Sequence, residues 1–141
     1  MILIDSNVII DLFGNGGEWQ TWSEQAVIQA GADDALAVSP IVVAEVAPRL
    51  GSLDGFVERI GRFGATVVAL SNEAAFAAGE AFNVHRQRRR SDEDSARSII
   101  ADFLIGGQAL ALGATILTRD PRFYRSYFPT VPLITPETSL L

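Results

Sequence analysis

The sequence predicts an α/β fold with a mainly parallel sheet, and two observations carry that prediction. Short apolar runs alternate with longer helical segments along all 141 residues, as in strands joined by helical crossovers. No internal repeat, low-complexity tract or linker interrupts this alternation. We therefore expect residues 1–141 to form one domain, with four to five strands and helices on both faces of the sheet.

Short apolar runs, several of them rich in β-branched residues, mark the expected strands. They lie at residues 2–4, 35–38, 66–70, 115–117 and 131–134. Sites in parallel sheets are built at the carboxyl ends of the strands, so the residues that follow these runs are the first candidates for function.

Helical spacing and terminating residues mark the helices between the strands. They are expected at 7–13, 19–30, 41–47, 51–63, a long alanine-rich segment that follows Ser71 or Asn72 and leads into the arginine cluster, and the segment around Asp102. Ser39 and Pro40 offer a cap and a first helical residue, and Pro48 ends the helix that they open. Ser71 or Asn72 is expected to cap the long alanine-rich helix.

The last long helix carries one charge in an apolar stretch. Residues 99–112 read IIADFLIGGQALAL, with Asp102 as the single charged side chain. We expect a polar loop at 91–95 before this helix, an end near Gly113, and close approach of another element at Gly106 and Gly107.

Composition excludes several classes of protein. Hydrophobic residues make up 48% of the chain, which excludes a disordered protein, and no apolar run is long enough for a membrane span. The absence of cysteine excludes disulfides and thiolate sites, and the absence of lysine excludes P-loop and Schiff-base chemistry. The N-terminus lacks the basic region of a secretory signal, so we expect a cytoplasmic protein without a membrane partner.

Four carboxylates stand out because each is isolated in apolar surroundings or follows a strand. Asp5 and Asp120 come just after expected strands, while Glu45 and Asp102 are on helices expected to pack beside them. Taken singly, Asp5 or Asp120 is equally well explained as a capping or turn residue, and Glu45 as an exposed helical one. Together they predict an acidic site.

Such a site needs positive charge, and the sequence offers little near these acids. The chain has one histidine, and Arg119 is the only arginine adjacent to any of the four. A divalent cation is the economical solution, and oxygen ligands without sulfur or imidazole favour Mg²⁺ or Mn²⁺. With carboxylates and water, such an ion is suited to phosphodiester hydrolysis.

The sequence closely resembles a PIN-domain protein of the VapC toxin family. Four segments carry the resemblance: MILIDSNVIIDLF, IVVAEVA and ADFLIGGQALALGATILTRD, followed by PRFYRSYFP. The resemblance spans essentially the whole chain and implies a PIN-like three-layer sandwich. It also implies a Mg²⁺- or Mn²⁺-dependent endoribonuclease, a cognate small antitoxin that occludes the site, and a toxin homodimer.

The resemblance assigns residues as well. Asp5, Glu45, Asp102 and Asp120 match the acidic quartet of the family. Asp5 and Asp102 are the expected direct metal ligands, while Glu45 and Asp120 would orient metal-bound water or hold a second ion. Asn7 and Thr118 are the expected supporting residues.

Positive charge is concentrated in one cluster of arginines. The net charge is −6, yet Arg86, Arg88, Arg89 and Arg90 lie together after a helix. They are explained either as a solvated helix end or as phosphate contacts, and we favour RNA contacts for Arg86 and Arg89. Arg119 is expected either to pair with Asp120 or to contact phosphate.

Asp11 and His85 are not expected to take part in catalysis. Asp11 is expected on an exposed helical face, and His85 lacks a neighbouring acid or second histidine.

Two other functions stay open on the sequence. One is a nuclease of the same fold in RNA processing or DNA repair, and the other is a PIN-like domain that binds RNA or protein without cleavage. The intact quartet disfavours the second, because a non-catalytic domain has no need to hold four clustered acids.

Overall fold

A computed structural model describes residues 1–14, 17–88 and 93–138, and for residues 93–100 it describes the backbone alone. The strands in these ranges are β1 (Ile2–Ile4), β2 (Leu36–Val38), β3 (Ala65–Val67), β4 (Thr115–Leu117) and β5 (Leu133–Ile134). They form one sheet in the order β3-β2-β1-β4-β5, and every neighbouring pair is parallel. The predicted α/β class with a parallel sheet is confirmed.

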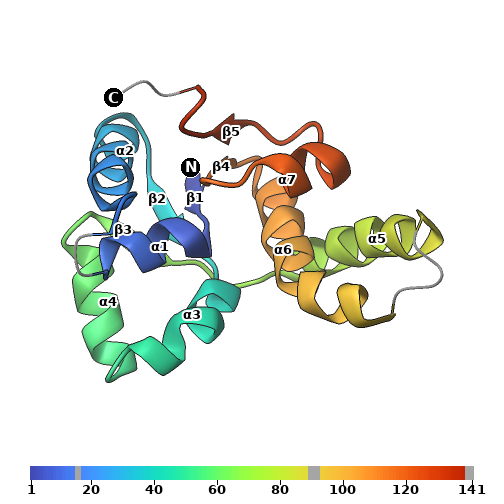
Figure 1. Cartoon of the computed structure of the whole chain (residues 1–141), viewed down its shortest axis with the longest axis horizontal. Coiled ribbons are helices and arrows are strands. Elements are labelled where there is room, and N and C mark those ends of the chain that lie inside the picture. Colours follow the sequence, from blue (N-terminus) through green and yellow to red (C-terminus); the bar gives the residue numbers. More distant parts are fainter. Residues whose placement is uncertain (15–16, 89–92, 139–141) are drawn as a thin grey trace.

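Helices connect every pair of consecutive strands. They are α1 (Ser6–Leu12), α2 (Gln20–Asp33), α3 (Pro40–Val46), the 3-10 helix η1 (Ala47–Arg49), α4 (Leu53–Gly61), α5 (Asn72–Arg88), α6 (Glu93–Leu112) and α7 (Arg122–Tyr127). The strand order reverses at β1, so right-handed crossovers put α1–α4 and α5–α7 on opposite faces of the sheet. Figure 1 shows these two groups of helices on opposite sides of the strands.

This topology creates the crevice in which a site is expected. The chain runs outward from β1 through β2 to β3, and then returns across the sheet to β4 on the other side of β1. The carboxyl ends of β1 and β4 therefore lie side by side at the switch point, where loops diverge to opposite faces.

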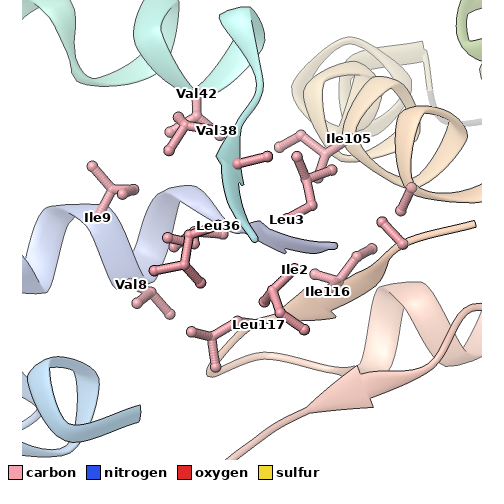
Figure 2. Close-up of a cluster of buried hydrophobic side chains, with 14 of the residues drawn as sticks. Ile2, Leu3, Val8, Ile9, Leu36, Val38, Val42, Ile105, Ile116 and Leu117 are labelled. Atoms are coloured by element: carbon pink, nitrogen blue, oxygen red, sulfur yellow. The ribbon is translucent and has the colours of Figure 1, made fainter. Parts of the chain in front are cut away.

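The centre of the sheet is buried from both sides. All residues of β1 and β2 are buried, which is typical of central parallel strands with both faces covered by helices. Figure 2 shows Leu3, Val38 and Ile116 of the strands among side chains from the helices, including Val8 and Ile105. This apolar contact holds the strand ends in fixed positions.

Two helix starts follow the predicted capping chemistry. The Ser39 hydroxyl accepts a hydrogen bond from the backbone N–H of Ile41 at 3.2 Å, and Pro40 is the first residue of α3. The Ser71 hydroxyl accepts from the backbone N–H of Ala74 at 3.1 Å, so Ser71 caps α5 and Asn72 begins it.

The predicted close approach at the glycine pair is confirmed. A Cβ atom on Gly107 would lie 2.5 Å from the backbone oxygen of Ala74 and 2.7 Å from the backbone nitrogen of Ala78 in α5. A Cβ atom on Gly106 would lie 2.3 Å from the Phe128 ring. Both positions admit only glycine without movement of a neighbour, because real Cβ contacts are longer than these.

Some element boundaries differ from prediction. The strands at 66–70 and 131–134 are shorter than expected because pairing ends with the short partner strands. Helix α7 had no counterpart in the prediction, since its six residues are too few to show a helical period. The predicted loop at 91–95 is wrong from Glu93 onward, where α6 has begun; acidic residues are favourable in a first helical turn.

Candidate metal-dependent nuclease site

The four predicted acids come from separate elements that meet at the carboxyl ends of β1 and β4. Asp5 follows β1 and is the N-cap of α1, and Asp120 lies in the connection between β4 and α7. Glu45 is on α3, Asp102 is on α6, and these two helices pack against each other. The quartet thus joins both helical layers to the centre of the sheet.

The electrostatics of Asp102 indicate that the other three acids lie near it. Burial, and after it the charges of Asp5, Glu45 and Asp120, together raise the pKa of Asp102 to about 7. Burial and the Asp5 charge likewise raise the pKa of Glu45. Mutual repulsion of this kind requires proximity, so the structure brings the predicted quartet together.

Asp5 is the most buried of the quartet, with 3% of its surface exposed. Burial raises the pKa of Asp5, but hydrogen bonds from Thr118 and Ser6 oppose that effect. The Thr118 hydroxyl donates to Oδ2 at 2.7 Å, and the Ser6 backbone N–H donates to Oδ1 at 2.8 Å. The Asn7 amide is at 3.4 Å from Oδ2. These donors compensate the desolvation of the carboxylate.

Asn7 and Thr118 link α1 to the connection after β4. The Asn7 amide donates to the Thr118 hydroxyl at 3.1 Å, and its oxygen accepts from the backbone N–H of Arg119 at 3.1 Å. The Thr118 hydroxyl also accepts from the backbone N–H of Asp120 at 3.1 Å. The two predicted supporting residues therefore lie where they hold the Asp5 carboxylate and the backbone of Asp120.

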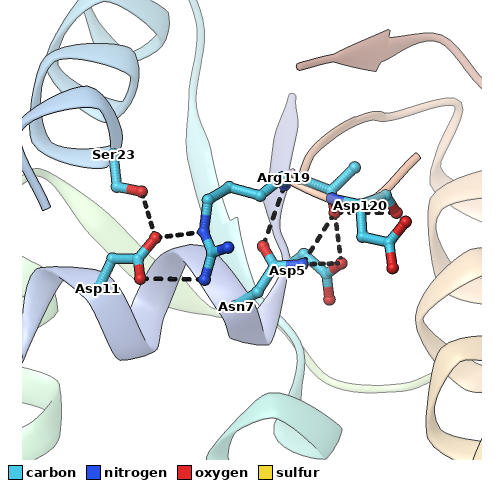
Figure 3. Close-up of polar contacts among 7 residues, drawn as sticks. Asp5, Asn7, Asp11, Ser23, Arg119 and Asp120 are labelled. Carbon is cyan, nitrogen blue, oxygen red and sulfur yellow. Dashed lines mark hydrogen bonds and ion pairs between the residues drawn. The ribbon is translucent and has the colours of Figure 1, made fainter. Parts of the chain in front are cut away.

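Arg119 is engaged with Asp11 rather than with Asp120. Its Nε donates to Asp11 Oδ2 at 2.6 Å and its Nη2 to Oδ1 at 3.1 Å, a bidentate ion pair. The Ser23 hydroxyl of α2 donates to the same Asp11 oxygen at 2.6 Å (Figure 3). The expectation that Asp11 is exposed is wrong, because its side chain is only 12% exposed. A phosphate contact by Arg119 stays a prediction.

Arg86 and Arg88 lie in the last turn of α5. Arg86 is exposed, and Arg88 lies over the ring of Tyr127 at 5.4 Å from its centroid. Arg89 and Arg90 lie outside the described residues. His85 is buried, and its Nδ1 is 2.7 Å from the Tyr127 hydroxyl, within a group of aromatic rings. This placement agrees with a structural histidine.

Three residues near the quartet had not been singled out as contributors. Ser6 donates through its hydroxyl to Glu45 Oε2 at 3.5 Å, and Asp11 holds Arg119. Tyr124 of α7 is buried, and burial and the Asp5 charge raise the pKa of its hydroxyl. Ser6 had a sequence signal, since it lies between two predicted site residues. Tyr124 had none, because its approach depends on the position of α7.

The oxygen donors of the four acids are of the kind that a divalent cation such as Mg²⁺ needs. Among the side chains described, no three histidine or acidic groups are close enough together to hold a metal ion as they stand. Mg²⁺ does not require such a cage, because it binds through one or two carboxylates and keeps several waters. Asp5, Glu45 and Asp102 all have raised pKa values. In the described part of the chain, no arginine forms an ion pair with any of these three acids. This uncompensated negative charge fits a hydrated cation.

No helix within the described ranges is long and apolar enough to cross a membrane.

Several solved structures share this fold. VapBC2 from Rickettsia felis bound to a promoter DNA fragment aligns with a TM-score of 0.67 and 17% identity, over 96% of this chain and 98% of that chain. VapBC-1 from nontypeable Haemophilus influenzae aligns with a TM-score of 0.63 and 20% identity, over 96% and 98%. A toxin-antitoxin complex from Klebsiella pneumoniae gives 0.61 and 21%, over 96% and 98%.

Comparison at the level of sequence gives the family. No curated protein matches the chain significantly. The PIN domain family, however, matches residues 2–129, a range that includes all four acids, both supporting residues and the sheet strands up to β4. The chain therefore belongs to the PIN domain family.

Proposed function

We propose that the chain is a Mg²⁺- or Mn²⁺-dependent endoribonuclease and the toxin of a toxin–antitoxin pair. One observation carries the catalytic part of this proposal. Four carboxylates from separate chain segments converge at the switch point of the sheet, where the pKa of Asp102 is raised to about 7. Repulsion between these carboxylates raises the free energy of the metal-free protein. A bound cation would remove the repulsion, and this would explain why the fold keeps the acids together.

The roles within the quartet follow from burial and support. Asp5 is fixed by several donors, and Asp102 is half-buried and faces the other acids, so these two are the proposed direct ligands. Glu45 and Asp120 are both more exposed, which suits residues that orient water or hold a second ion. When bound, the cation would lower the pKa of a coordinated water and stabilise charge on the phosphoryl oxygens.

The chain's own residues provide positioning and proton acceptance. Thr118 and Asn7 hold Asp5 in one orientation, so the carboxylate need not reorganise when the ion and RNA bind. The Ser6 hydroxyl supports Glu45 in a similar way. Burial and neighbouring charge raise the pKa of both Glu45 and Asp102, to about 7 for Asp102, so Asp102 is suited to accept a proton from water near neutral pH.

RNA is the proposed substrate, and arginines are its proposed contacts. Arg86 is exposed at the end of α5, where a phosphate can reach it without displacing another side chain. Arg89 is proposed from the sequence alone. For Arg119, a phosphate contact would add to its ion pair with Asp11, since part of the side chain, 26%, stays exposed.

The proposed partner is a cognate small antitoxin protein that occludes the acidic site. Support comes from the solved structures with this fold, several of which are VapBC or toxin-antitoxin complexes. A homodimer and a cytoplasmic location are further parts of this proposal.

Cleavage of a mixed RNA pool tests the catalytic part. We expect cleavage by the wild type with Mg²⁺ or Mn²⁺, none with EDTA, and loss of at least about a hundredfold in rate for Asp5→Asn. Asp33→Asn is the matched control, because Asp33 is an exposed acid at the end of α2. Identical products from wild type and Asp5→Asn in Mg²⁺ would refute the catalytic proposal.

A second experiment separates the toxin from the other candidates. Expression of the wild type is expected to arrest growth, and co-expression of a small open reading frame adjacent to the gene is expected to relieve the arrest. Cleavage without arrest would favour a nuclease of RNA processing or DNA repair, and RNA binding without cleavage would favour a non-catalytic domain. Sequencing of RNA ends after brief expression would identify the cleaved bond.

A further inference from the structure

Arg122 is the first residue of α7 and lies beside the Asp120 carboxylate, with its Nε 3.9 Å from Asp120 Oδ1. Within the described ranges, it is the only arginine that forms an ion pair with a member of the acidic quartet. The arginines expected from the sequence to contact RNA did not include it. The ion pair places one positive charge at a site that otherwise collects negative charge.

The ion pair between Arg122 and Asp120 is loose enough to be exchanged for another partner. The two side chains are 93% and 71% exposed, and their atoms are too far apart for a hydrogen bond. Exposed pairs of this kind contribute little to stability, because water and salt screen them. Arg122 can therefore leave Asp120 for a phosphate without a cost to the fold.

The two arginines that flank Arg122 in the chain are held more firmly. The Arg119 side chain extends away from Asp120 toward Asp11 (Figure 3), and its Nε and Nη2 donate to Asp11 at 2.6 and 3.1 Å. One turn after Arg122, the Nη2 of Arg125 donates to a Glu137 oxygen at 2.8 Å. Of these three arginines, Arg122 alone keeps all the N–H donors of its guanidinium free of hydrogen bonds to the described residues.

The backbone that carries Arg122 is fixed, although the side chain is exposed. Pro121 before it is buried. The ring of Phe123 after it packs edge-on against Phe103 of α6, with 4.7 Å between the ring centroids. This contact anchors the start of α7 to the helix that carries Asp102. A ligand at the site would therefore move the Arg122 side chain and leave its backbone in place.

We propose that Arg122 binds the RNA phosphate that enters the acidic site, and that it exchanges Asp120 for this phosphate. The inference rests on the proposed function. A guanidinium offers paired N–H donors that match two phosphate oxygens. Once the Asp120 carboxylate faces a cation or its water, the guanidinium is free to turn to the phosphate. There it would stabilise the charge that develops on the phosphate oxygens during cleavage.

The rate of RNA cleavage tests this role. Arg122→Gln is expected to lower kcat at least about tenfold, and Arg122→Lys to retain part of the rate, because lysine keeps the charge but loses the paired donors. Arg125→Gln is the matched control, since the same change one turn later removes an arginine that is bonded to Glu137 instead. Circular dichroism and the unfolding midpoint verify that all three variants fold.

Mn²⁺ affinity separates a phosphate contact from an indirect effect through Asp120. Arg122→Gln removes a positive charge beside a proposed metal-site acid, so calorimetry should show Mn²⁺ binding that is equal to or tighter than in the wild type. Weaker Mn²⁺ binding in parallel with a loss of kcat would overturn the phosphate contact, because Arg122 would then act by holding Asp120.

RNA binding without cleavage provides a second, independent readout. Fluorescence anisotropy of a labelled single-stranded RNA is measured in the Asp5→Asn background, where we expect the RNA to stay intact. Adding Arg122→Gln should reduce the slope of log affinity against log salt by about 1, as the loss of one phosphate contact requires. Adding Arg125→Gln should leave the slope unchanged. Equal slopes in the two double variants would overturn the contact.

The failures of the two proposals differ. An active wild type with equal kcat in Arg122→Gln and Arg125→Gln would overturn the role of Arg122 and leave the nuclease proposal intact. A wild type that binds RNA without cleaving it would overturn the nuclease proposal and the part of Arg122 in cleavage, and the salt slopes would still decide the phosphate contact. A wild type that neither binds nor cleaves RNA would overturn both.

Discussion

At the scale of single residues, the environment of Asp102 makes the stability of the fold depend on pH. Burial and three neighbouring carboxylates raise its pKa from 3.8 to about 7. A carboxyl of this kind carries its proton in the folded protein over a pH range where the unfolded chain has lost it. Folding stability in the absence of metal is therefore linked to pH through this residue.

We expect metal-free protein to become less stable as the pH rises through about 7. The contribution of Asp102 is fully present below the unfolded pKa and is lost as the pH passes the folded value. Asp5 and Glu45 act in the same direction, because both have raised pKa values. We expect a loss of roughly 1–2 kcal/mol for Asp102 between about pH 5 and about pH 8, after discounting for its partial exposure.

Urea unfolding in EDTA at the two pH values measures this loss. Asp102→Asn should flatten the pH dependence, whereas the exposed control Asp33→Asn should keep it. An unchanged slope in Asp102→Asn would assign the effect to other groups.

At the scale of elements, α6 is the helix that carries Asp102 to the site, and its position depends on the glycine pair. Gly107 lets the backbone of α5 approach α6 directly, and Gly106 accommodates the Phe128 ring after α7. The apolar stretch around Asp102 is thus the part of α6 that packs against its neighbours, and the carboxylate emerges from that packed region toward the quartet.

We expect Gly107→Ala to destabilise the protein by about 1–3 kcal/mol. The new Cβ would lie 2.5 Å from a backbone oxygen of α5, and backbone cannot move aside as a flexible side chain can. Gly79→Ala is the matched control within the same helix pair. A Cβ there meets nothing within 4 Å, so this change should stabilise α5 by up to about 1 kcal/mol.

Thermal or urea unfolding measures both glycine variants. Equal stability of Gly107→Ala and Gly79→Ala would show that α5 and α6 separate without cost, contrary to the packing described.

Arg86 and Arg119 lie on different elements, and we expect them to have different roles. Arg86 is at the exposed end of α5, whereas Arg119 joins the connection after β4 to Asp11 of α1. Arg86→Gln is expected to leave stability unchanged and to reduce the slope of log affinity for RNA against log salt by about 1. Arg119→Gln is expected to destabilise the protein by about 1–3 kcal/mol, because it leaves Asp11 without its ion pair.

Salt-dependent RNA binding and urea unfolding, measured on both variants, test this division. An unchanged salt slope in Arg86→Gln would remove Arg86 from the RNA contacts. Full stability in Arg119→Gln would show that the ion pair with Asp11 is dispensable.

At the scale of the whole molecule, the site exists only when the chain is folded. Asp5 and Asp120 are brought together by pairing of β1 with β4, and Glu45 and Asp102 by contact of α3 with α6. Unfolding therefore separates the proposed ligands, and a cation that they held would stabilise the folded state.

We expect Mn²⁺ at about 100 times its dissociation constant to raise the unfolding free energy by about 2.7 kcal/mol. The rise should be lost in Asp5→Asn and kept in Asp33→Asn, as measured by thermal unfolding with and without Mn²⁺. The same rise in Asp5→Asn would place the ion elsewhere on the protein.

The order of strands and helices was accessible from the sequence because local patterns determine it. Each of these patterns affects only the backbone within a few residues. Examples are the β-branched runs, the helix cap at Ser39 and the helix-terminating Pro48. Short elements and the ends of strands could not be predicted in this way. The six-residue helix α7 shows no period, and the strand ends depend on the lengths of their partners.

The quartet was also accessible, because an isolated carboxylate in apolar surroundings needs compensation wherever the fold places it. Asp5, Glu45, Asp102 and Asp120 are all conspicuous in the chain for this reason. Asp11 gave no such signal, because its neighbours resemble those of an exposed helical residue, and only the approach of Arg119 buries it.

The sequence by itself determined the alternation of elements, the parallel sheet and the chemical character of the site, since these depend on residue type and local order. Only the tertiary structure decided that Arg119 pairs with Asp11 and that the Asn7 amide donates to the Thr118 hydroxyl. The physical reason is that hydrogen bonds and ion pairs form within about 3 Å. Which groups come that close, among residues over 100 positions apart, depends on the packing of the helices against the sheet.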